Sequence, residues 1–257
     1  MTQEYYAVGG AEALLAHHGL DSFSALWALK LDAVDAPNTN RGGWSSVYRL
    51  ELPDVHGVLR GYYLKRQQDH LTRSLRHPLG EPTFAKEFRA IKRYESLGIP
   101  ALKAVYFGQR IYKGSRQALL LTEALDDYES LSLLLEKWRT LNRQDRCNLI
   151  TAAAGLVRTL HRSGNVHKCL YPKHIFIGLN AERGAARLID LEKTRRAWLA
   201  RKDYVSDLAT LSRKSKEPSR TDRLRFLLEY MQQPRLDVRA RVLIKHIQKR
   251  IEVKNRR

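Results

Sequence analysis

The chain has 257 residues, 43% of them hydrophobic, and its 46 lysines and arginines outnumber its 27 acidic residues, which gives a net charge of +19. This length and apolar content exclude a wholly disordered chain and allow one large domain or two lobes around a hydrophobic core. So high a positive charge favours an anionic partner such as nucleic acid, an anionic membrane or a phosphorylated glycolipid, although a basic surface can also serve solubility alone.

The predicted elements of the first half describe a mostly antiparallel sheet with one clear helix. Residues 11–31 carry a helical apolar pattern that Gly19 interrupts. The segment 66–80 is predicted to be a basic loop, and the pattern over 82–97 predicts a helix with Gly98 at its C-cap. Alternating apolar and polar residues predict four strands, over 46–52, 58–65, 105–109 and 118–123.

The predicted elements after Glu123 are mainly helical. Short strands are predicted over 175–177 and 187–189. A β-rich half followed by an α-rich half is typical of an α+β fold with two lobes and a hinge at 124–127. Helical patterns cover 131–138, 144–162, 203–212, 221–231 and 238–251. We expect an N-terminal extension and β-rich N-lobe over 1–124, and an α-rich C-lobe over 125–257.

The C-terminal residues 235–257 combine nine lysines and arginines with apolar residues at helical spacing. This pattern predicts a basic amphipathic helix, suited to an anionic membrane surface. The alternative is a C-lobe helix that packs on the core and keeps its charged side in water.

The compartment is predicted from cysteine usage and from the N-terminus. Cys147 and Cys169 are too few for a disulfide framework, so we expect a reducing environment. Glu4 and Glu12 interrupt the N-terminal residues, which lack the pattern of a signal peptide. The longest apolar-rich stretch is too short to span a bilayer. We expect a cytoplasmic location that allows peripheral membrane contact.

The most informative stretch is the loop at 167–174, which matches the spacing of the kinase pattern H-R-D-L-x-x-x-N with two changes. Cys169 stands at the position of the catalytic Asp, and His174 at the position of the metal-binding Asn. Asp190, at the tip of the next strand, is a candidate metal ligand, although Asp is also a common turn former. His174 and Asp190 can together hold Mg²⁺, or His174 can bind a phosphate oxygen directly. His167 is the candidate brace of this catalytic loop, and Asp207 its anchor or a helix N-cap.

A phosphotransferase site also needs a loop that covers the phosphates, a cationic side chain that binds them and a carboxylate that holds this side chain in place. Lys65, at the end of a predicted strand, is the candidate phosphate ligand. Glu87 lies beside the apolar face of the 82–97 helix, where it pairs with Lys65 or remains a carboxylate in water. Next to the hinge, Glu123 and Leu125 are candidate nucleotide contacts. The candidate phosphate cover, or else a plain hairpin turn, contains Gly42, Gly43, Ser45 and Ser46.

The stretch 166–176, together with 188–193, resembles the bacterial lipopolysaccharide core kinase family, which includes heptose and Kdo kinases and InaA-type proteins. The resemblance runs from about Asn40 to Leu211 and is closest to the InaA-type members. It implies a protein-kinase-like fold, ATP with Mg²⁺, and phosphorylation of a sugar hydroxyl of the lipopolysaccharide inner core at the cytoplasmic face of the inner membrane. It also implies phosphate binding by Lys65 and metal binding by His174 and Asp190.

Cys169 departs from the active heptose kinases, in which this position is the Asp that receives the acceptor proton. A slow kinase, a kinase with another base such as Glu192 or Asp190, and a nucleotide-binding pseudokinase that scaffolds envelope assembly all stay open. An aminoglycoside- or choline-kinase-like enzyme shares the fold, but those families keep the loop Asp. A nucleic-acid partner is not expected, because no RNP, helix-turn-helix or zinc-ligand spacing is present.

Overall fold

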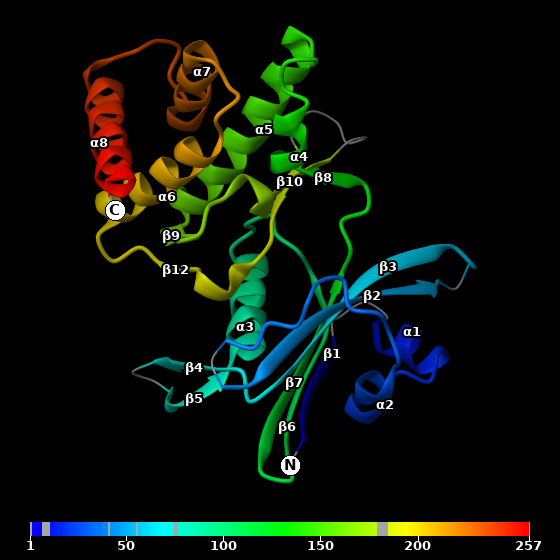
Figure 1. Ribbon diagram of the computed structural model, residues 1–257. Coiled ribbons are helices and arrows are strands. Elements are labelled where there is room, and N and C mark those ends of the chain that lie inside the picture. Colours follow the sequence, from blue (N-terminus) through cyan, green and yellow to red (C-terminus); the bar gives the residue numbers. More distant parts are fainter. Residues whose placement is uncertain are drawn as a thin grey trace. The chain divides into compact units, whose positions relative to one another are not determined.

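The computed structural model describes residues 2–6, 11–40, 42–54, 56–74, 77–178 and 185–256. The chain divides into two compact units, Met1–Arg93 with Leu102–Asp126, and Tyr94–Ala101 with Asp127–Arg257. The first unit is built on an antiparallel sheet and the second on helices (Figure 1). The predicted α+β class is therefore confirmed.

The sheet of the first unit has the strand order β1-β6-β7-β3-β2 within the described residues. All neighbouring strands are antiparallel. The strand β1 was not predicted, because it is short and its place at the edge comes from pairing with β6, at least 100 residues further along the chain. The strands are β1 (Thr2–Tyr6), β2 (Trp44–Pro53), β3 (Leu59–Gln68), β6 (Ala104–Tyr112) and β7 (Ser115–Glu123).

The two faces of this sheet carry different elements. The helices α1 (Ala11–His17) and α2 (Phe23–Ala28) place Leu15 and Phe23 in one core with Leu64 of β3. Gly19 separates the two helices as predicted and has a φ of +65°, which glycine adopts without strain. Because side chains alternate along a strand, Lys65 faces the other side of the sheet, where α3 (Thr83–Ser96) lies (Figure 1).

The predicted basic loop over 66–80 is wrong. The strand β3 continues to Gln68, and the segment that follows forms the hairpin of β4 (Leu71–Ser74) and β5 (His77–Pro82). The polar residues that end β3 hid this extension, because the side chains of Gln67 and Gln68 form hydrogen bonds within the protein and not with solvent.

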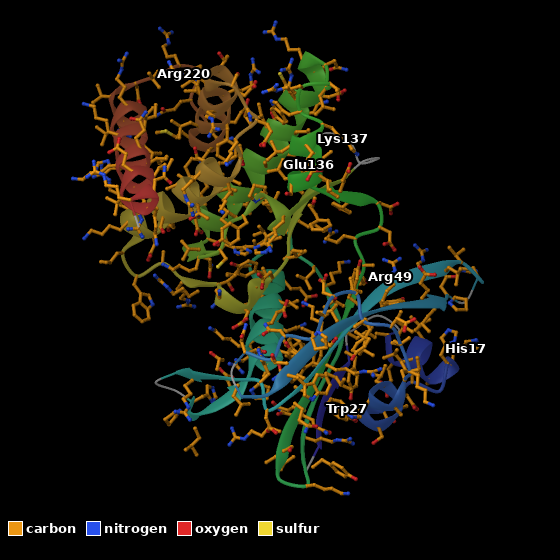
Figure 2. All side chains as sticks on the ribbon, viewed as in Figure 1. His17, Trp27, Arg49, Glu136, Lys137 and Arg220 are labelled. Carbon is orange, nitrogen blue, oxygen red and sulfur yellow. The ribbon has the colours of Figure 1, made fainter. Side chains whose placement is uncertain are left out.

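The link after β7 is held to the sheet by an ion pair. Arg49 of β2, labelled in Figure 2, binds Asp126 in a bidentate manner, with N–O distances of 2.6 and 2.9 Å. A Cβ at Gly61 would lie 2.3 Å from Asp126 Oδ2, so a larger residue there would require the side chains of this pair to shift. The hydrogen bond to Asp126 is the main cause that raises the pKa of Arg49.

Within the described residues, the second unit is a helical bundle with one three-stranded and one two-stranded sheet. Helix α5 packs on α7, and α6 packs on α8 (Figure 1). The strand β10 (Ile175–Gly178) pairs with β8 (Tyr128–Ser130) and β11 (Ala186–Leu188), and β9 (Asn165–Val166) pairs with β12 (Arg195–Arg196). The helices are α4 (Leu131–Glu136), α5 (Arg143–Arg162), α6 (Ala200–Lys214), α7 (Arg220–Met231) and α8 (Val238–Asn255).

The bundle contains a partly open cavity of about 610 Å³ that is lined mostly by apolar side chains of all five helices. The residues Ile244, Ile247 and Ile251 place the apolar side of α8 on this cavity. The C-terminal helix is thus a packed helix of the bundle with its charged side in water. Within the described part of the chain, every helix is too short or too polar to cross a bilayer.

Candidate active site

The predicted ion pair between Lys65 and Glu87 is present. Lys65 Nζ lies 2.7 Å from Glu87 Oε1, and the glutamate side chain is only 4% exposed. The alternative of a glutamate in water is therefore wrong. A carboxylate so deeply buried requires a cation, and its position holds the lysine side chain in one orientation on β3.

The start of α3 is fixed by Gln67, which sequence reasoning missed. Gln67 is fully buried and lies on the same face of β3 as Lys65. Its Oε1 accepts hydrogen bonds from the backbone N of Phe84 and from the hydroxyl of Thr83, at 2.8 and 2.7 Å, and its Nε2 donates to the carbonyl of His70. Gln67 thus caps the first turn of α3, one turn before Glu87. A glutamine at the end of a strand carries no signal in the sequence for this role.

The glycine-rich segment is a turn between an extended stretch and β2. Backbone bonds join Asn38 to Ser45 on both sides of this turn. A Cβ at Gly43 would lie 2.1 Å from the carbonyl oxygen of Gln68, so this position requires glycine. Ser45 pairs with Gln67 and shares the face of Lys65, whereas Ser46 is buried and faces the opposite side. Of the two serine hydroxyls, that of Ser46 therefore cannot join a site around Lys65.

Asp207 anchors the backbone of the loop at 167–174. It is 1% exposed, and its two carboxylate oxygens accept hydrogen bonds from the backbone N of His167 and of Lys168, at 2.7 and 2.9 Å. Lys168 has a φ of +67°, a conformation that a lysine rarely adopts. The charge-assisted bonds to Asp207 hold the loop in this strained form.

Replacing Asp207 by alanine should lower the free energy of unfolding by about 2–5 kcal/mol, because a buried and a partly buried N–H group lose their charged acceptor. Urea denaturation followed by circular dichroism measures this change. The matched control is Glu136→Ala, at an exposed position labelled in Figure 2, which should change stability by less than about 0.5 kcal/mol. Equal effects of the two substitutions would contradict the anchoring role.

His167 and His174, both neutral, lie at the two ends of the loop at 167–174. Burial lowers the pKa of His167, and its Nε2 donates to the carbonyl of Ile189 at 2.9 Å. Burial also lowers the pKa of His174, against the opposing effect of Asp190. The Nδ1 of His174 lies 2.8 Å from the carbonyl oxygen of Cys169, and since a carbonyl only accepts, Nδ1 carries the proton. The lone pair of His174 is therefore on Nε2.

Asp190 presents a carboxylate to that lone pair. Its Oδ2 lies 3.3 Å from His174 Nε2, and its backbone is left-handed, with a φ of +56°. Two acceptors at this distance repel each other unless a proton or a metal ion lies between them. Adjacent ligands of an octahedral Mg²⁺ are about 3 Å apart at metal–ligand distances of about 2.1 Å, so the pair fits a magnesium ion.

The donor set around this pair is small. Among the residues that the structure describes, no group of three His, Cys, Asp or Glu side chains can hold a metal. Two protein ligands suit Mg²⁺, which keeps waters and commonly takes its other ligands from phosphate oxygens.

The half-buried thiol of Cys169 lies on the same loop, and both cysteines are free. Glu123 ends β7 and donates its backbone N–H to Lys103, with Leu125 two residues further along.

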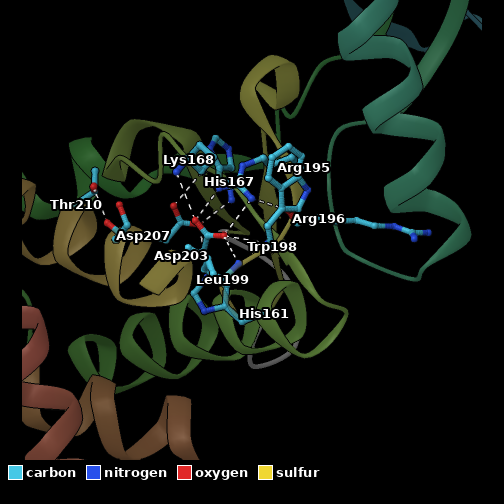
Figure 3. A network of polar contacts seen from close by, with 11 residues as sticks. His161, His167, Lys168, Arg195, Arg196, Trp198, Leu199, Asp203, Asp207 and Thr210 are labelled. Atoms are coloured by element: carbon cyan, nitrogen blue, oxygen red, sulfur yellow. Dashed lines mark hydrogen bonds and ion pairs between the residues drawn. The ribbon is translucent and has the colours of Figure 1, made fainter. Parts of the chain in front are cut away.

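A second buried carboxylate, Asp203, was missed because the sequence pattern marked it as the start of a helix. The helix α6 begins three residues earlier, and Asp203 binds Arg195 through both oxygens, at 2.7 and 3.0 Å (Figure 3). It also accepts from the backbone N of Trp198 and of Leu199 and lies 3.6 Å from Lys168 Nζ. Burial by itself raises the pKa of Asp203, but these hydrogen bonds outweigh that effect and hold the pKa below its usual range.

A buried lysine–glutamate pair between a sheet and a helix, and an Asp-anchored loop beside a strand-tip aspartate, define a protein-kinase-like fold. A computed comparison with solved structures agrees: "WaaP in complex with acyl carrier protein" matches with a TM-score of 0.67 and 23% identity, covering 97% of this chain and 98% of that one. The model of the lipopolysaccharide kinase (Kdo/WaaP) family matches residues 24–230. The chain belongs to this family.

Two curated relatives are similar to the chain. Protein InaA of Escherichia coli (strain K12) is 33% identical over 181 residues, which cover 68% of this chain and 80% of that protein. Lipopolysaccharide core heptose(I) kinase WaaP of Pseudomonas aeruginosa (strain PAO1) is 28% identical over 159 residues, which cover 58% of this chain and 59% of that protein. The resemblance seen in the sequence is thereby confirmed.

Proposed function

We propose that the chain transfers a phosphoryl group from ATP to a sugar hydroxyl of the lipopolysaccharide inner core, with Mg²⁺ as cofactor. The observation that carries the proposal is the carboxylate of Asp190 held against the lone pair of His174, a pair suited to a magnesium ion. Membership of a lipopolysaccharide kinase family supports both the reaction class and the acceptor.

The roles of the remaining residues follow from their positions. Lys65, oriented by Glu87, neutralises phosphate oxygens, and the turn at Gly42 and Gly43 offers backbone N–H groups to them, with the hydroxyl of Ser45 as a further donor. The backbone of Glu123 and Leu125 contacts the base of the nucleotide. When bound, Mg²⁺ offsets the negative charge that develops on the transferred phosphoryl group. His167 keeps the loop in place through Ile189.

Cys169 occupies the position from which a base accepts the proton of the acceptor hydroxyl. A thiol is a weaker base than a carboxylate at this place, so we propose slow transfer. The specific alternative, favoured by the same residue, is a pseudokinase that binds nucleotide and acts as a scaffold in envelope assembly. Thermal stabilisation by ATP with no transfer to any core oligosaccharide would favour the pseudokinase.

The positive net charge of the protein supports both the proposed glycolipid acceptor and the proposed location at a membrane. The net charge of +19 suits a phosphorylated glycolipid and the anionic membrane surface around it. We propose a cytoplasmic protein that contacts the inner face of the inner membrane without spanning it.

The direct test is transfer of labelled phosphate from ATP to purified lipopolysaccharide core in the presence of Mg²⁺. We expect label in the core that depends on the protein and disappears when Mg²⁺ is chelated. Label that appears equally without the protein, or none with any core acceptor, rejects the kinase assignment.

We further propose that the cavity of the second unit receives the acyl chain of an acyl carrier protein. The solved neighbour is described as a complex with such a protein, and this cavity has the volume and the apolar lining that an alkyl chain requires. Arg220, labelled in Figure 2, and Arg223 add positive charge to its lining.

Narrowing the cavity should weaken this binding. Ile247→Trp places a larger ring in the cavity, whereas Val253→Trp changes an exposed position of the same helix that is not part of the lining. We expect Ile247→Trp to weaken binding of acylated carrier protein by about tenfold or more, since burial of the chain is lost. Binding by Ile247→Trp equal to that of Val253→Trp, measured by calorimetry, would show that the cavity is not the acyl site.

A further inference from the structure

The segment 193–203, which runs from the end of the 3-10 helix η2 (Leu191–Lys193) through β12 into the first turn of α6, presents an exposed apolar pair among positive charges. Trp198 is 81% exposed and Leu199 is 62% exposed. The single acidic residue of this segment, Asp203, is buried and neutralised by Arg195. Four exposed cations accompany the pair: Lys193, Arg196, Arg201 and Lys202. The exposed side chains of the segment are thus apolar or positive.

The pair is presented on a fixed backbone. The N–H groups of Trp198 and Leu199 donate to the same carboxylate oxygen of Asp203, at 3.1 and 3.2 Å, and the backbone N of Asp203 donates back to Leu199 (Figure 3). The guanidinium of Arg195 lies 5.3 Å from the centre of the Trp198 ring. A surface that is already ordered loses little conformational entropy when it binds. The exposure of the tryptophan is therefore a built feature of the loop.

We propose that Trp198, Leu199 and the four cations, here called the 193–203 anchor, dock on the surface of an anionic lipid bilayer. A tryptophan ring, apolar with one polar N–H, is favoured at the boundary between headgroups and acyl chains, and lysines and arginines beside it are attracted to anionic headgroups. Lysine is depleted from the centres of protein–protein interfaces, so this composition favours lipid over a protein partner. The apolar side of α8 lines the cavity and is not available for this contact.

The anchor is one side chain away from the catalytic loop. Asp203 holds the anchor through Trp198 and Leu199, and its Oδ1 lies 3.6 Å from the Nζ of Lys168 (Figure 3). The consequence drawn here rests on the proposed function: a glycolipid acceptor in the same bilayer would be delivered next to the loop. Bilayer docking itself rests only on the anchor.

Flotation with lipid vesicles tests docking without ATP or acceptor. The vesicles are phosphatidylcholine alone or phosphatidylcholine with about one third phosphatidylglycerol. We expect binding to the anionic vesicles only, and about tenfold or greater weakening in Trp198→Ala/Leu199→Ala. Ile111→Ala/Tyr112→Ala, which removes another exposed apolar pair beside a lysine, is the matched control and should bind as the parent does. Arg196→Glu/Arg201→Glu should also lose binding.

Brominated lipids report the contact at one residue. They should quench the fluorescence of the parent and not that of Trp198→Phe, since the other tryptophans are buried or half-buried. Equal binding to neutral vesicles, undiminished binding of Trp198→Ala/Leu199→Ala, or an equal loss in the control pair would each overturn the proposal. The proposal would also be overturned if Trp198→Ala/Leu199→Ala lost binding of carrier protein and kept binding of vesicles. If Trp198→Ala/Leu199→Ala loses phosphate transfer only to acceptor carried in vesicles, the proposed function and the anchor both stand. If the parent protein docks on vesicles and transfers no phosphate, the proposed function alone is rejected.

Discussion

Replacing Asp190 by asparagine should lower phosphate transfer to the core by about 10³-fold, because the proposed magnesium ion would lose the carboxylate of the His174–Asp190 pair. The asparagine side chain keeps the size and one oxygen, so loss of charge and not of packing is measured. Asp190 is half exposed, and the fold should therefore survive. The readout is the rate of transfer as a function of Mg²⁺ concentration.

Two controls make this prediction specific. Glu217→Gln removes a negative charge at an exposed position and should leave the rate unchanged. Lys65→Met removes the proposed phosphate ligand and should lower the rate to a similar degree as Asp190→Asn. An Asp190→Asn variant with the parent's rate and the parent's Mg²⁺ dependence would remove Asp190 from the site.

Replacing Cys169 by aspartate should raise the rate of transfer by about 10²–10⁴-fold, the usual contribution of a general base. The loop is already in place for this base, since Asp207 holds the two residues before position 169 and His174 donates to its carbonyl. In this variant the position of the base has the residue of the kinase pattern, while His174 stays in place of the Asn. The measurement is kcat for transfer to core oligosaccharide.

Further substitutions separate the explanations of this result. Cys169→Ala leaves the rate unchanged if the thiol takes no proton and lowers it if the thiol does. Cys147→Asp, a change to the same residue type on α5, should give no gain. If Cys169→Asp binds ATP and still transfers nothing, the missing function lies outside proton removal and the pseudokinase explanation gains.

The fold was predictable where local pattern and tertiary structure agree. The amphipathic pattern with Gly98 placed α3 to within one residue at each end, and Gly98 has a φ of +64° after the helix. The β4–β5 hairpin and β1 were missed because their pairing partners, and not their own periodicity, make them strands.

The site was predictable where a carboxylate stands in an unusual place. Glu87 beside an apolar face and Asp190 at a strand tip both drew attention, and the structure gives each a close partner. Gln67 and Asp203 were missed because polar residues at the end of a strand and at the start of a helix are ordinary in sequence. Only their buried hydrogen bonds distinguish them.

The central claim is that this protein places a phosphate on the lipopolysaccharide core. It is tested most directly by mass spectrometry of core oligosaccharide from cells that carry the gene, lack it, or carry the Asp190→Asn variant. We predict that cores from the second and third strains lack one phosphate that the first strain has. Identical core spectra from all three strains would contradict the kinase account.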